Sequence, residues 1–390
     1  MDHWTTTQRI IAFPPNMEIS ADTEFRFGVL SWAKSHCNWR FIMPEFRVGE
    51  QDPGFTAREV DAAIVPGNNI KAIKLFRRRK IPLLLGDPFP IDFKSISLYK
   101  GLSFAKVDNA AIAQMAVDLF LTHGYTSLAY VDEPNEHSWS AERRCAFVKI
   151  AKAAKARVDV YADFTDRERK SWLSERPRMI RWLQSLPKPT AILAAMDGRA
   201  RLILDACQVA GIPVPEDIAV LGVDNDRLIC ESTSPALSSI RINGFKYGEL
   251  AAETLAKLID QPDLAPIEIH IPPESVLLRD SIAYGAMQDP TVAKALRFIH
   301  ENTNRPISVL DVAAASSCSR RHLEILFAEK IGRSVKHCIL NARLARVKDL
   351  LLSTTLPISE IAERCGFPYE SNLSTTFKRE TGLTMQEWRQ

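Results

Sequence analysis

The stretches VAAASSCSRRHLEILFAEKIG at 312–332 and IAERCGFPYESNLSTTFKRETG at 361–382 carry the same pattern. In each stretch an apolar residue followed by Ala precedes Leu-x-x-x-Phe and then Gly, at an offset of 49 residues for the first pair and 50 for the others. Leu and Phe four positions apart lie on one face of a helix, and two helical segments with a break between them are typical of a helix-turn-helix unit. The duplication therefore predicts two such units in tandem, with DNA as their partner.

A helix expected over residues 334–353 joins the two units. Its apolar stripe consists of Leu340, Leu344, Val347 and Leu351. About 20 residues span roughly 30 Å of helix, which is close to the roughly 34 Å of one turn of B-DNA. This length predicts that the units enter successive major-groove segments on one face of the duplex. A helical solenoid or a dimerisation bundle is the alternative, but two units are too few for a stable solenoid.

The Leu and Phe of each second helix must face the core, so its other positions point outward. In the first unit (308–331) and the second unit (358–381), the outward positions are Arg320, Arg321, His322, Glu324, Ser371, Asn372, Ser374 and Thr375. Arg can bind guanine with two hydrogen bonds, Glu can accept from cytosine and Asn can pair with adenine. We expect the first unit to carry most of the sequence specificity. Candidates for phosphate contact are Arg343, Arg346, Lys378 and Arg379, and a solvated charge is the alternative for each.

Composition limits the class of protein. A chain of 390 residues is too long for one ordinary core, so two or three domains are expected. Hydrophobic residues make up 46% and charged residues 25%, as in globular proteins. No apolar run approaches the roughly 20 residues that cross a bilayer. Residues 1–9 lack the layout of a signal peptide, so we expect a cytoplasmic protein.

The positive charge lies in the duplicated segment. Residues 289–390 hold 15 Lys and Arg against 11 Asp and Glu, whereas the rest of the chain holds 35 against 36. This excess suits phosphate contact, although solvated helix faces could also carry it. The seven cysteines are at least twenty positions apart, which predicts isolated thiols and no metal site.

The first 280 residues alternate short apolar runs with longer amphipathic ones. Strands are expected at 9–13, 39–43, 62–65, 82–85, 127–131, 158–161, 191–195 and 219–223. Helices are expected at 24–35, 70–79, 110–123, 141–156, 178–185, 199–210 and 247–258. Such alternation predicts parallel sheets covered by helices, in two lobes. The alternation stops near Ile282, and Asp289-Pro290 begins a helix, so we expect a domain over 1–281, a linker over 282–289 and an all-helical domain over 290–390.

The segment from Pro306 to Trp388 resembles the AraC-type DNA-binding domain. The resemblance is carried by ISEIAERCGF at 358–367 and FKRETGLT at 377–384. It implies a seven-helix domain of a transcription activator that acts beside RNA polymerase. Met385 departs from the pattern, because the family commonly has Pro there.

The front segment resembles the effector domain of LacI/GalR-type regulators, a two-lobed α/β type I periplasmic-binding-protein fold. The motifs are HGYTSLAYV (123–131), SWSAERRCAF (138–147), AILAAMDGRA (191–200), GIPVPEDIAVLGVDN (211–225) and PALSSIRINGFKYGELAAETLAKLI (235–259). A sensor of this type followed by an AraC-type domain is similar to the xylose operon regulators. The resemblance implies a sugar bound between two lobes, chain crossings near 107 and 236, and a homodimer.

Candidate effector-binding residues follow the expected strands. Ligands of open α/β sheets lie beyond the carboxyl ends of the strands, and short carboxylates and amides suit a polyhydroxylated ligand. The candidates at such ends are Asp87, Asp108, Asp197, Asp224 and Asn225, joined by Arg143 as a donor fork, Trp139 as a flat apolar surface and Asp22 by family position. A helix N-cap is the alternative for Asp108, and a core position is the alternative for Trp139. Met196 departs from sugar-binding relatives, which usually have a short polar residue there.

These features predict a ligand-responsive transcription regulator that is not an enzyme and needs no cofactor. A phosphate-binding loop of the GxxxxGK type and a Ser/His/Asp constellation with motif context are both missing from the sequence. DNA-repair enzymes that carry an AraC-type module need clustered cysteines, which this chain lacks. The alternative is a sugar-binding protein of the transport or chemosensing type, against which the tandem DNA units count.

Overall fold

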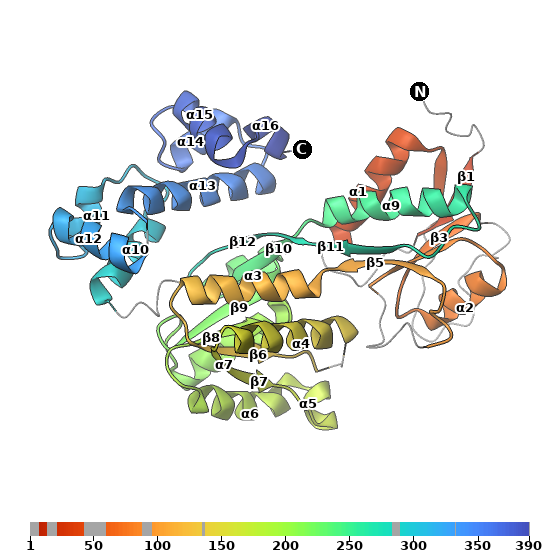
Figure 1. Ribbon diagram of the computed structural model, residues 1–390, viewed down its shortest axis with the longest axis horizontal. Coiled ribbons are helices and arrows are strands. Elements are labelled where there is room, and N and C mark those ends of the chain that lie inside the picture. The colour runs from red at the N-terminus through yellow and green to blue at the C-terminus, as the bar shows by residue number, and fades with distance from the viewer. Residues whose placement is uncertain are drawn as a thin grey trace.

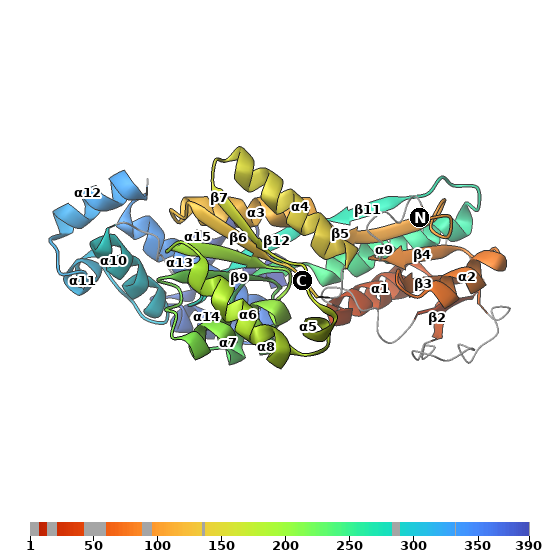
Figure 2. The ribbon, with the colours of Figure 1, turned by 90° about the horizontal axis from the view of Figure 1, so that it is seen from below.

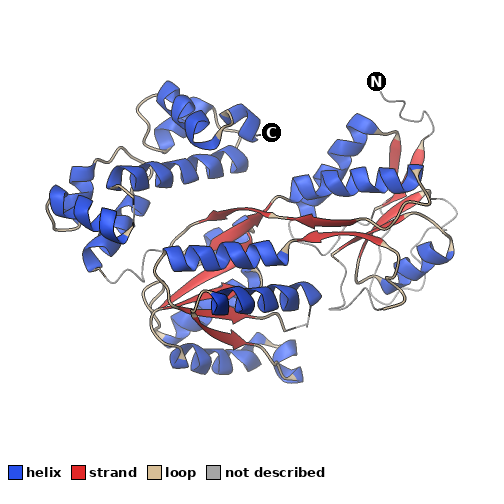
Figure 3. Cartoon of the chain, in the orientation of Figure 1, coloured by secondary structure: helices blue, strands red, loops and turns tan. Residues whose placement is uncertain are grey.

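The computed structural model describes residues 8–13, 22–42, 60–87, 96–134, 137–282, 289–331 and 333–389. Two six-stranded sheets, each covered by helices, are followed by a set of helices at the carboxyl end (Figures 1 and 3). The two-lobed α/β fold and the all-helical domain that the sequence predicts are both confirmed. None of the described helices combines the length and the apolar content that crossing a bilayer requires.

The first lobe is built on a parallel sheet of order β11-β5-β4-β3-β1-β2. Its strands are β1 (Arg9–Ala12), β2 (Trp39–Ile42), β3 (Ala62–Pro66), β4 (Leu83–Gly86), β5 (Ser103–Val107) and β11 (Glu268–Ile271). Its helices are α1 (Asp22–His36), α2 (Ile70–Arg78) and α9 (Gly244–Asp260). Helices α1 and α9 pack with their backbones in contact, because a Cβ at Gly28 would lie 2.0 Å from Phe245 O and one at Gly248 would lie 1.9 Å from Phe25 O.

The second lobe has a sheet of order β12-β10-β9-β8-β6-β7, in which only β12 runs antiparallel to its neighbour. Its strands are β6 (Ser127–Val131), β7 (Arg157–Tyr161), β8 (Thr190–Ala194), β9 (Ile218–Asp224), β10 (Ser238–Ile242) and β12 (Pro273–Leu277). Its helices are α3 (Asn109–Thr122), α4 (Ser138–Ala153), α5 (Asp166–Lys170), α6 (Trp172–Ser185), α7 (Asp197–Ala210) and α8 (Arg227–Ser232).

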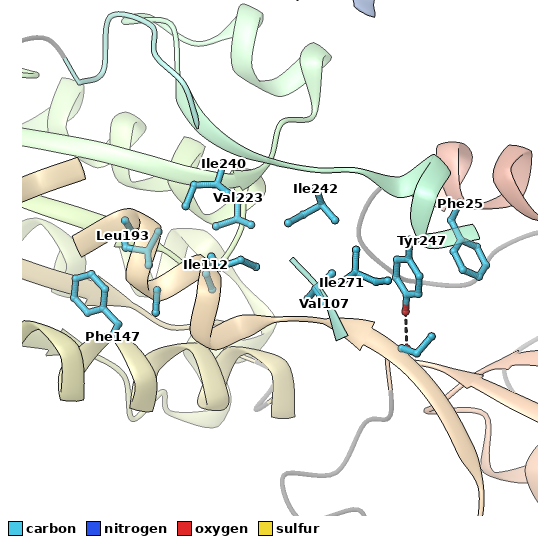
Figure 4. Packing of buried hydrophobic residues seen from close by; sticks show 14 of the residues in the cluster. Phe25, Val107, Ile112, Phe147, Leu193, Val223, Ile240, Ile242, Tyr247 and Ile271 are labelled. Atoms are coloured by element: carbon cyan, nitrogen blue, oxygen red, sulfur yellow. Dashed lines mark hydrogen bonds between the residues drawn. The ribbon is translucent and has the colours of Figure 1, made fainter. Parts of the chain in front are cut away.

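The chain crosses between the lobes three times, after β5, after β10 and after β11. The sequence analysis placed two crossings, near 107 and 236, and did not expect β5, β10, β11 or β12. Strands β11 and β12 were missed because charged and half-exposed residues interrupt their apolar positions. One buried cluster runs through all three crossings, at Val107, Ile242 and Ile271 (Figure 4). The hydroxyl group of Tyr247 on α9 also donates a hydrogen bond to the Ala105 carbonyl of β5 at 2.6 Å, so α9 is fixed to the strand that leads into the first crossing.

The carboxyl-terminal domain contains seven helices within residues 289–389. They are α10 (Pro290–Glu301), α11 (Val309–Ala315), α12 (Arg320–Lys330), α13 (Val335–Ser353), α14 (Ile358–Arg364), α15 (Glu370–Thr381) and α16 (Met385–Arg389). Helix α13 connects two separate cores, with Val335 and Ile339 in the first and Leu344, Val347 and Leu351 in the second. The amino-terminal part of α13 thus packs in the core of the first helix-turn-helix unit, and its carboxyl-terminal part packs in the core of the second.

The two turns share a left-handed residue 49 positions apart. Ser317 has φ 56° between α11 and α12, and Gly366 has φ 67° between α14 and α15. A Cβ at Gly366 would lie 2.5 Å from the Arg305 carbonyl oxygen, so the second turn packs on the segment that precedes the first unit. The repeat therefore includes the turn geometry as well as the helices.

Candidate functional site

A cleft of about 560 Å³ lies between the lobes, next to the crossing residues Val107 and Ile242. Its volume falls within the roughly 300–1,000 Å³ of small-molecule sites. Seven of the eight sequence-predicted effector residues line it: Asp22, Asp87, Trp139, Arg143, Asp197, Asp224 and Asn225. The cleft is therefore the place where the tertiary structure brings these candidates together.

Three cleft residues have backbone conformations that side chains rarely adopt. Asp87 after β4 has φ 38°, Asp224 at the end of β9 has φ 104°, and Asn225 has φ 55°. Such conformations cost about 1–3 kcal/mol each and cluster at functional sites. They turn the side chains at the carboxyl ends of two strands toward the cleft.

Asp197, the first residue of α7, is 1% exposed and links two other segments of the second lobe. Ser239 Oγ donates to its Oδ1 at 2.6 Å, and the Asp226 backbone N–H donates to its Oδ2 at 2.7 Å. Burial, followed by the Asp224 carboxylate nearby, raises the pKa of Asp197 to about 8. Near neutral pH this group is therefore largely protonated.

Asp87 faces the cleft from the first lobe and accepts a hydrogen bond from the Val107 N–H at 3.3 Å. Burial raises the pKa of Asp87 to about 7, against the Val107 N–H and the Arg143 guanidinium, which lower it, while Asp224 raises it. One acidic group from each lobe therefore titrates near neutral pH in the same cleft.

Arg143 on α4 is the most constrained donor of the site, at 1% exposed. Its Nε and Nη2 donate to Asn109 Oδ1 at 3.2 and 2.9 Å, and its Nη1 donates to the Ala195 carbonyl. These bonds use three of the five guanidinium N–H donors, which leaves two for a ligand. Asn109, which is not among the predicted residues, therefore orients the main donor of the cleft.

The apolar part of the cleft lies around Trp139. Its ring is 5.1 Å from the Arg143 guanidinium carbon and stacks on His137 at 5.5 Å. Met196 and Ile229 add further apolar lining from the second lobe. Apolar surface opposite carboxylates suits a sugar ring, which has C–H faces and hydroxyl edges. Met196, whose type departs from sugar-binding relatives, is thus itself a lining residue.

Asp108 does not line the cleft. Its Oδ1 accepts from the Ala111 N–H at 2.9 Å and caps α3, as the alternative interpretation of the sequence held. Asp22 lines the cleft as the first residue of α1 and lies 3.4 Å from Arg26 Nη2 on the next turn. The rest of the first loop, residues 14–21, lies outside the described residues.

The structure adds Glu24, Arg241 and Asp226 to the cleft. Glu24 follows Asp22 on α1, and Asp226 follows Asn225, so both lie beside predicted residues. Arg241 lies on β10, a strand that the sequence analysis did not expect, although its surrounding motif at 235–259 was noted. Alternation along that motif is the signal that would have found it.

An ion pair joins the lobes beside the Arg143 network. Lys106 Nζ of β5 lies 2.8 Å from Glu142 Oε1 of α4, and Glu142 Oε2 accepts from Asn109 Nδ2 at 3.1 Å. The cation comes from the first lobe and the carboxylate from the second. Relative movement of the lobes therefore acts on the same network that orients Arg143.

On α12, which we predict to be the reading helix of the first unit, the four predicted residues are all exposed. Arg320 Nε donates to Glu324 Oε1 at 2.9 Å, so these two side chains partly neutralise each other. Exposed pairs of this spacing are worth only about 0.3–0.5 kcal/mol, so a base can displace the contact. Arg321 and His322 have no ion pair with any residue that the structure describes.

Helix α15, the predicted reading helix of the second unit, presents smaller side chains. Ser371, Asn372 and Thr375 are exposed and Ser374 is half-buried. Thr375 Oγ1 donates to the Ser371 carbonyl at 2.9 Å, which draws its hydroxyl back to the helix. Asn372 is the most versatile hydrogen-bonding side chain in this set.

Of the four predicted phosphate contacts, Arg346, Lys378 and Arg379 are exposed. Arg343 is half-buried, and its Nη2 donates to the carbonyls of Arg305 and Ile307 at 3.2 and 3.4 Å. Arg343 therefore ties α13 to the segment before the first unit, and its contact with phosphate stays a prediction.

Two family descriptions match the sequence. Residues 117–282 match the periplasmic binding protein-like domain, and residues 312–390 match a helix-turn-helix domain. The first match covers most of the second lobe together with α9 and β11 of the first lobe, and the second match covers most of the two helix-turn-helix units.

Similar proteins match over most of the chain. The xylose operon regulatory protein of Haemophilus influenzae is 30% identical over 357 residues, which cover 91% of each chain. Its counterpart in Escherichia coli K12 is 33% identical over 293 residues, 75% of this chain and 74% of the other. A solved structure of the xylose-binding transcription activator xylR is 28% identical, with a TM-score of 0.63 over 98% of both chains.

Proposed function

The chain belongs to the family of xylose operon regulatory proteins, and on that premise we propose that it activates a sugar-catabolic operon when xylose or a related sugar occupies its cleft. Like its relatives, it is a DNA-binding transcription regulator and not an enzyme. The convergence of seven predicted residues on one interlobe cleft carries the proposal for this chain.

The chemistry of the cleft supports a small polyol. Carboxyl groups at Asp87, Asp197 and Asp224 can pair with hydroxyl groups, Arg143 can donate to ring or hydroxyl oxygens, and Trp139 can cover a C–H face. Met196 replaces a polar contact with a thioether, so we expect the preferred hydroxyl pattern to differ from that of a cleft with a polar residue there.

In the proposed mechanism the sugar binds both lobes and favours their closed arrangement. Closure alters a dimer of the sensor domains, and the attached helical domains then occupy neighbouring half-sites beside RNA polymerase in the cytoplasm. A ligand shifts such an equilibrium only by its difference in affinity for the two arrangements. The network from Lys106 through Glu142 to Arg143 gives the sugar a means to distinguish them.

Thermal melting of the full chain with a panel of pentoses, hexoses and sugar acids tests the effector assignment. A ligand bound only by the folded state raises the melting temperature, because it adds about 2.7 kcal/mol to the free energy of unfolding when its concentration is 100 times its Kd. The affinity for operator DNA, selected from random duplexes, is then measured with and without the stabilising sugar. If no sugar changes either quantity, the proposed function is wrong.

A further inference from the structure

Four side chains of alternating charge lead from the cleft to the DNA-binding domain. Glu24 Oε1 of α1 lies 3.3 Å from Arg241 Nη2 of β10, and Arg241 Nε lies 3.2 Å from Glu274 Oε2 of β12. Beyond Glu274 comes Lys348 of α13, with which Glu274 interacts electrostatically. Helix α13 runs over the second lobe on the side of β12 (Figure 1). The series thus joins both lobes and the helical domain.

The middle of this series is shielded from solvent. The side chain of Arg241 is 16% exposed and that of Glu274 is 24% exposed. Burial raises the pKa of Glu274, Arg241 and Lys348 lower it, and Glu24 raises it. Half-buried charges interact more strongly than the exposed pairs elsewhere on this surface. A change in the interactions of Arg241 should therefore alter the electrostatic environment of Glu274, and through Glu274 that of Lys348.

The two ends of the series have different roles. Glu24 and Arg241 line the cleft, whereas Glu274 is not among its lining residues and Lys348 lies on neither reading helix. Glu274 and Lys348 are thus placed to transmit a signal without contacting sugar or base edges. We propose that Arg241 and Glu274 couple occupancy of the cleft to the position of the DNA-binding domain through Lys348, an inference that rests on the proposed function.

The direction of coupling follows from charge competition. Glu274 is one carboxylate between two cations. A sugar that accepts hydrogen bonds from Arg241 weakens the pairing of Arg241 with Glu274, so the carboxylate attracts Lys348 more strongly. Binding of sugar should therefore draw Lys348 of α13 toward Glu274 of β12.

Lys348 also leads to a reading helix. Its Nζ lies 4.6 Å from the centre of the Trp388 ring, and that ring meets the Phe377 ring of α15 edge to face at 5.6 Å. Phe377 is a fully buried core residue of the second unit. A displacement of Lys348 should therefore alter the packing beneath α15, so we expect the second unit to respond to sugar.

A second interdomain ion pair provides a matched control. Arg297 Nη2 of α10 lies 2.5 Å from Glu216 Oε1 of the second lobe, with both side chains about half exposed. This pair also joins the sensor to the helical domain, but neither residue lines the cleft. It should hold the domains together without reporting the state of the cleft.

The experiment measures the ratio of operator affinity with and without xylose, or the sugar that most raises the melting temperature. The full-length chain is compared with Glu274→Gln, Lys348→Gln, Lys348→Arg and the control Arg297→Gln. Typical allosteric coupling gives a ratio of about 5–150, and we expect Glu274→Gln and Lys348→Gln to bring it within about twofold of one. Lys348→Arg keeps the charge and should keep the ratio, as should Arg297→Gln.

Sugar affinity without DNA, measured by calorimetry, separates coupling from damage. We expect it to stay within about threefold in all four variants, and DNA should raise it by the same ratio in the unaltered chain, because coupling is reciprocal. A ratio that persists in Lys348→Gln, or that is lost equally in Arg297→Gln, overturns the inference alone. An unaltered chain whose DNA affinity responds to no sugar overturns the proposed function as well.

Discussion

The cleft and the predicted DNA-reading surface both contain arginine side chains, but these differ in burial and in hydrogen bonding. Arg143 in the cleft is 1% exposed and held by three hydrogen bonds, whereas Arg320 on α12 has a side chain that is 58% exposed and one pair with Glu324. Figure 2 shows that α12, which carries Arg320, lies at one end of an elongated molecule, away from α4, which carries Arg143. The protein itself fixes the side chains of the cleft, whereas we predict that DNA orders most side chains of the reading surface.

The largest expected effect comes from replacing Arg143 in the cleft. In Arg143→Met we expect sugar affinity to fall by roughly 30-fold or more, because truncating a buried hydrogen-bonded charge costs about 2–5 kcal/mol. Calorimetric titration measures the loss, and the operator affinity without sugar should stay unchanged. Lys149→Ala, at an exposed position of the same helix, is the control. A folded Arg143→Met chain that binds sugar as the unaltered chain does would remove Arg143 from the site.

The next effect tests the reading surface. We expect Arg321→Ala to lower the affinity for operator by roughly tenfold, since a good bidentate base contact is worth about 1–3 kcal/mol. Affinity for non-specific DNA should fall far less, and competition binding measures the two together. Asn372→Ala on α15 should have the smaller effect. If Asn372→Ala abolished sequence preference while Arg321→Ala preserved it, the unequal roles of the two units would be reversed.

A smaller effect comes from the acidic groups of the cleft. The pKa of Asp87 is raised to about 7 and that of Asp197 to about 8, so both bind protons at pH 6. Sugar hydroxyls donate more favourably to carboxylates, so binding should lower both pKa values and release protons. Affinity should then rise as pH increases through 7 and 8 and level off above, by no more than about tenfold for each unit of pKa lowering.

Calorimetry in buffers of different ionisation enthalpy detects the released protons. In Asp197→Asn the part of the pH dependence near pH 8 should disappear. Sugar affinity that stays constant from pH 6 to 9, with no proton release, would show that neither carboxyl group changes its protonation on binding.

The smallest effect distinguishes two arginines of α13. Arg346→Ala should weaken DNA binding about threefold to fivefold for all sequences and reduce the salt slope by about one, as loss of one phosphate contact does. Arg343→Ala should leave the slope unchanged and lower the melting temperature, because Arg343 holds the carbonyls of Arg305 and Ile307. If both variants reduced the salt slope equally, Arg343 would contact phosphate as Arg346 does.

The sequence predicted most cleft residues because they occupy a recurrent position, the carboxyl end of a parallel strand. Asp87, Asp197 and Asp224 could be found in this way without knowing where the strands meet. The role of Asn109 could not be found in this way, because it depends on a contact with Arg143, 34 positions away. Alternation could have pointed to Arg241, but its pairing with Glu24 and Glu274 could not be predicted from the sequence. The hydrogen bonds of Arg343 with the carbonyls of Arg305 and Ile307 could not be predicted either, because they also join distant parts of the sequence.

The local patterns of the sequence determined most of the helices, most of the strands, the tandem helix-turn-helix units and the family. These depend on periodicity and on short capping and turn signals, which act between near neighbours. The third crossing, the cleft, the buried partners of Arg143 and the path from Arg241 to Lys348 were decided only by the tertiary structure. Burial and charge pairing across distant segments exist only once the lobes are packed, so they leave no periodic trace in the chain.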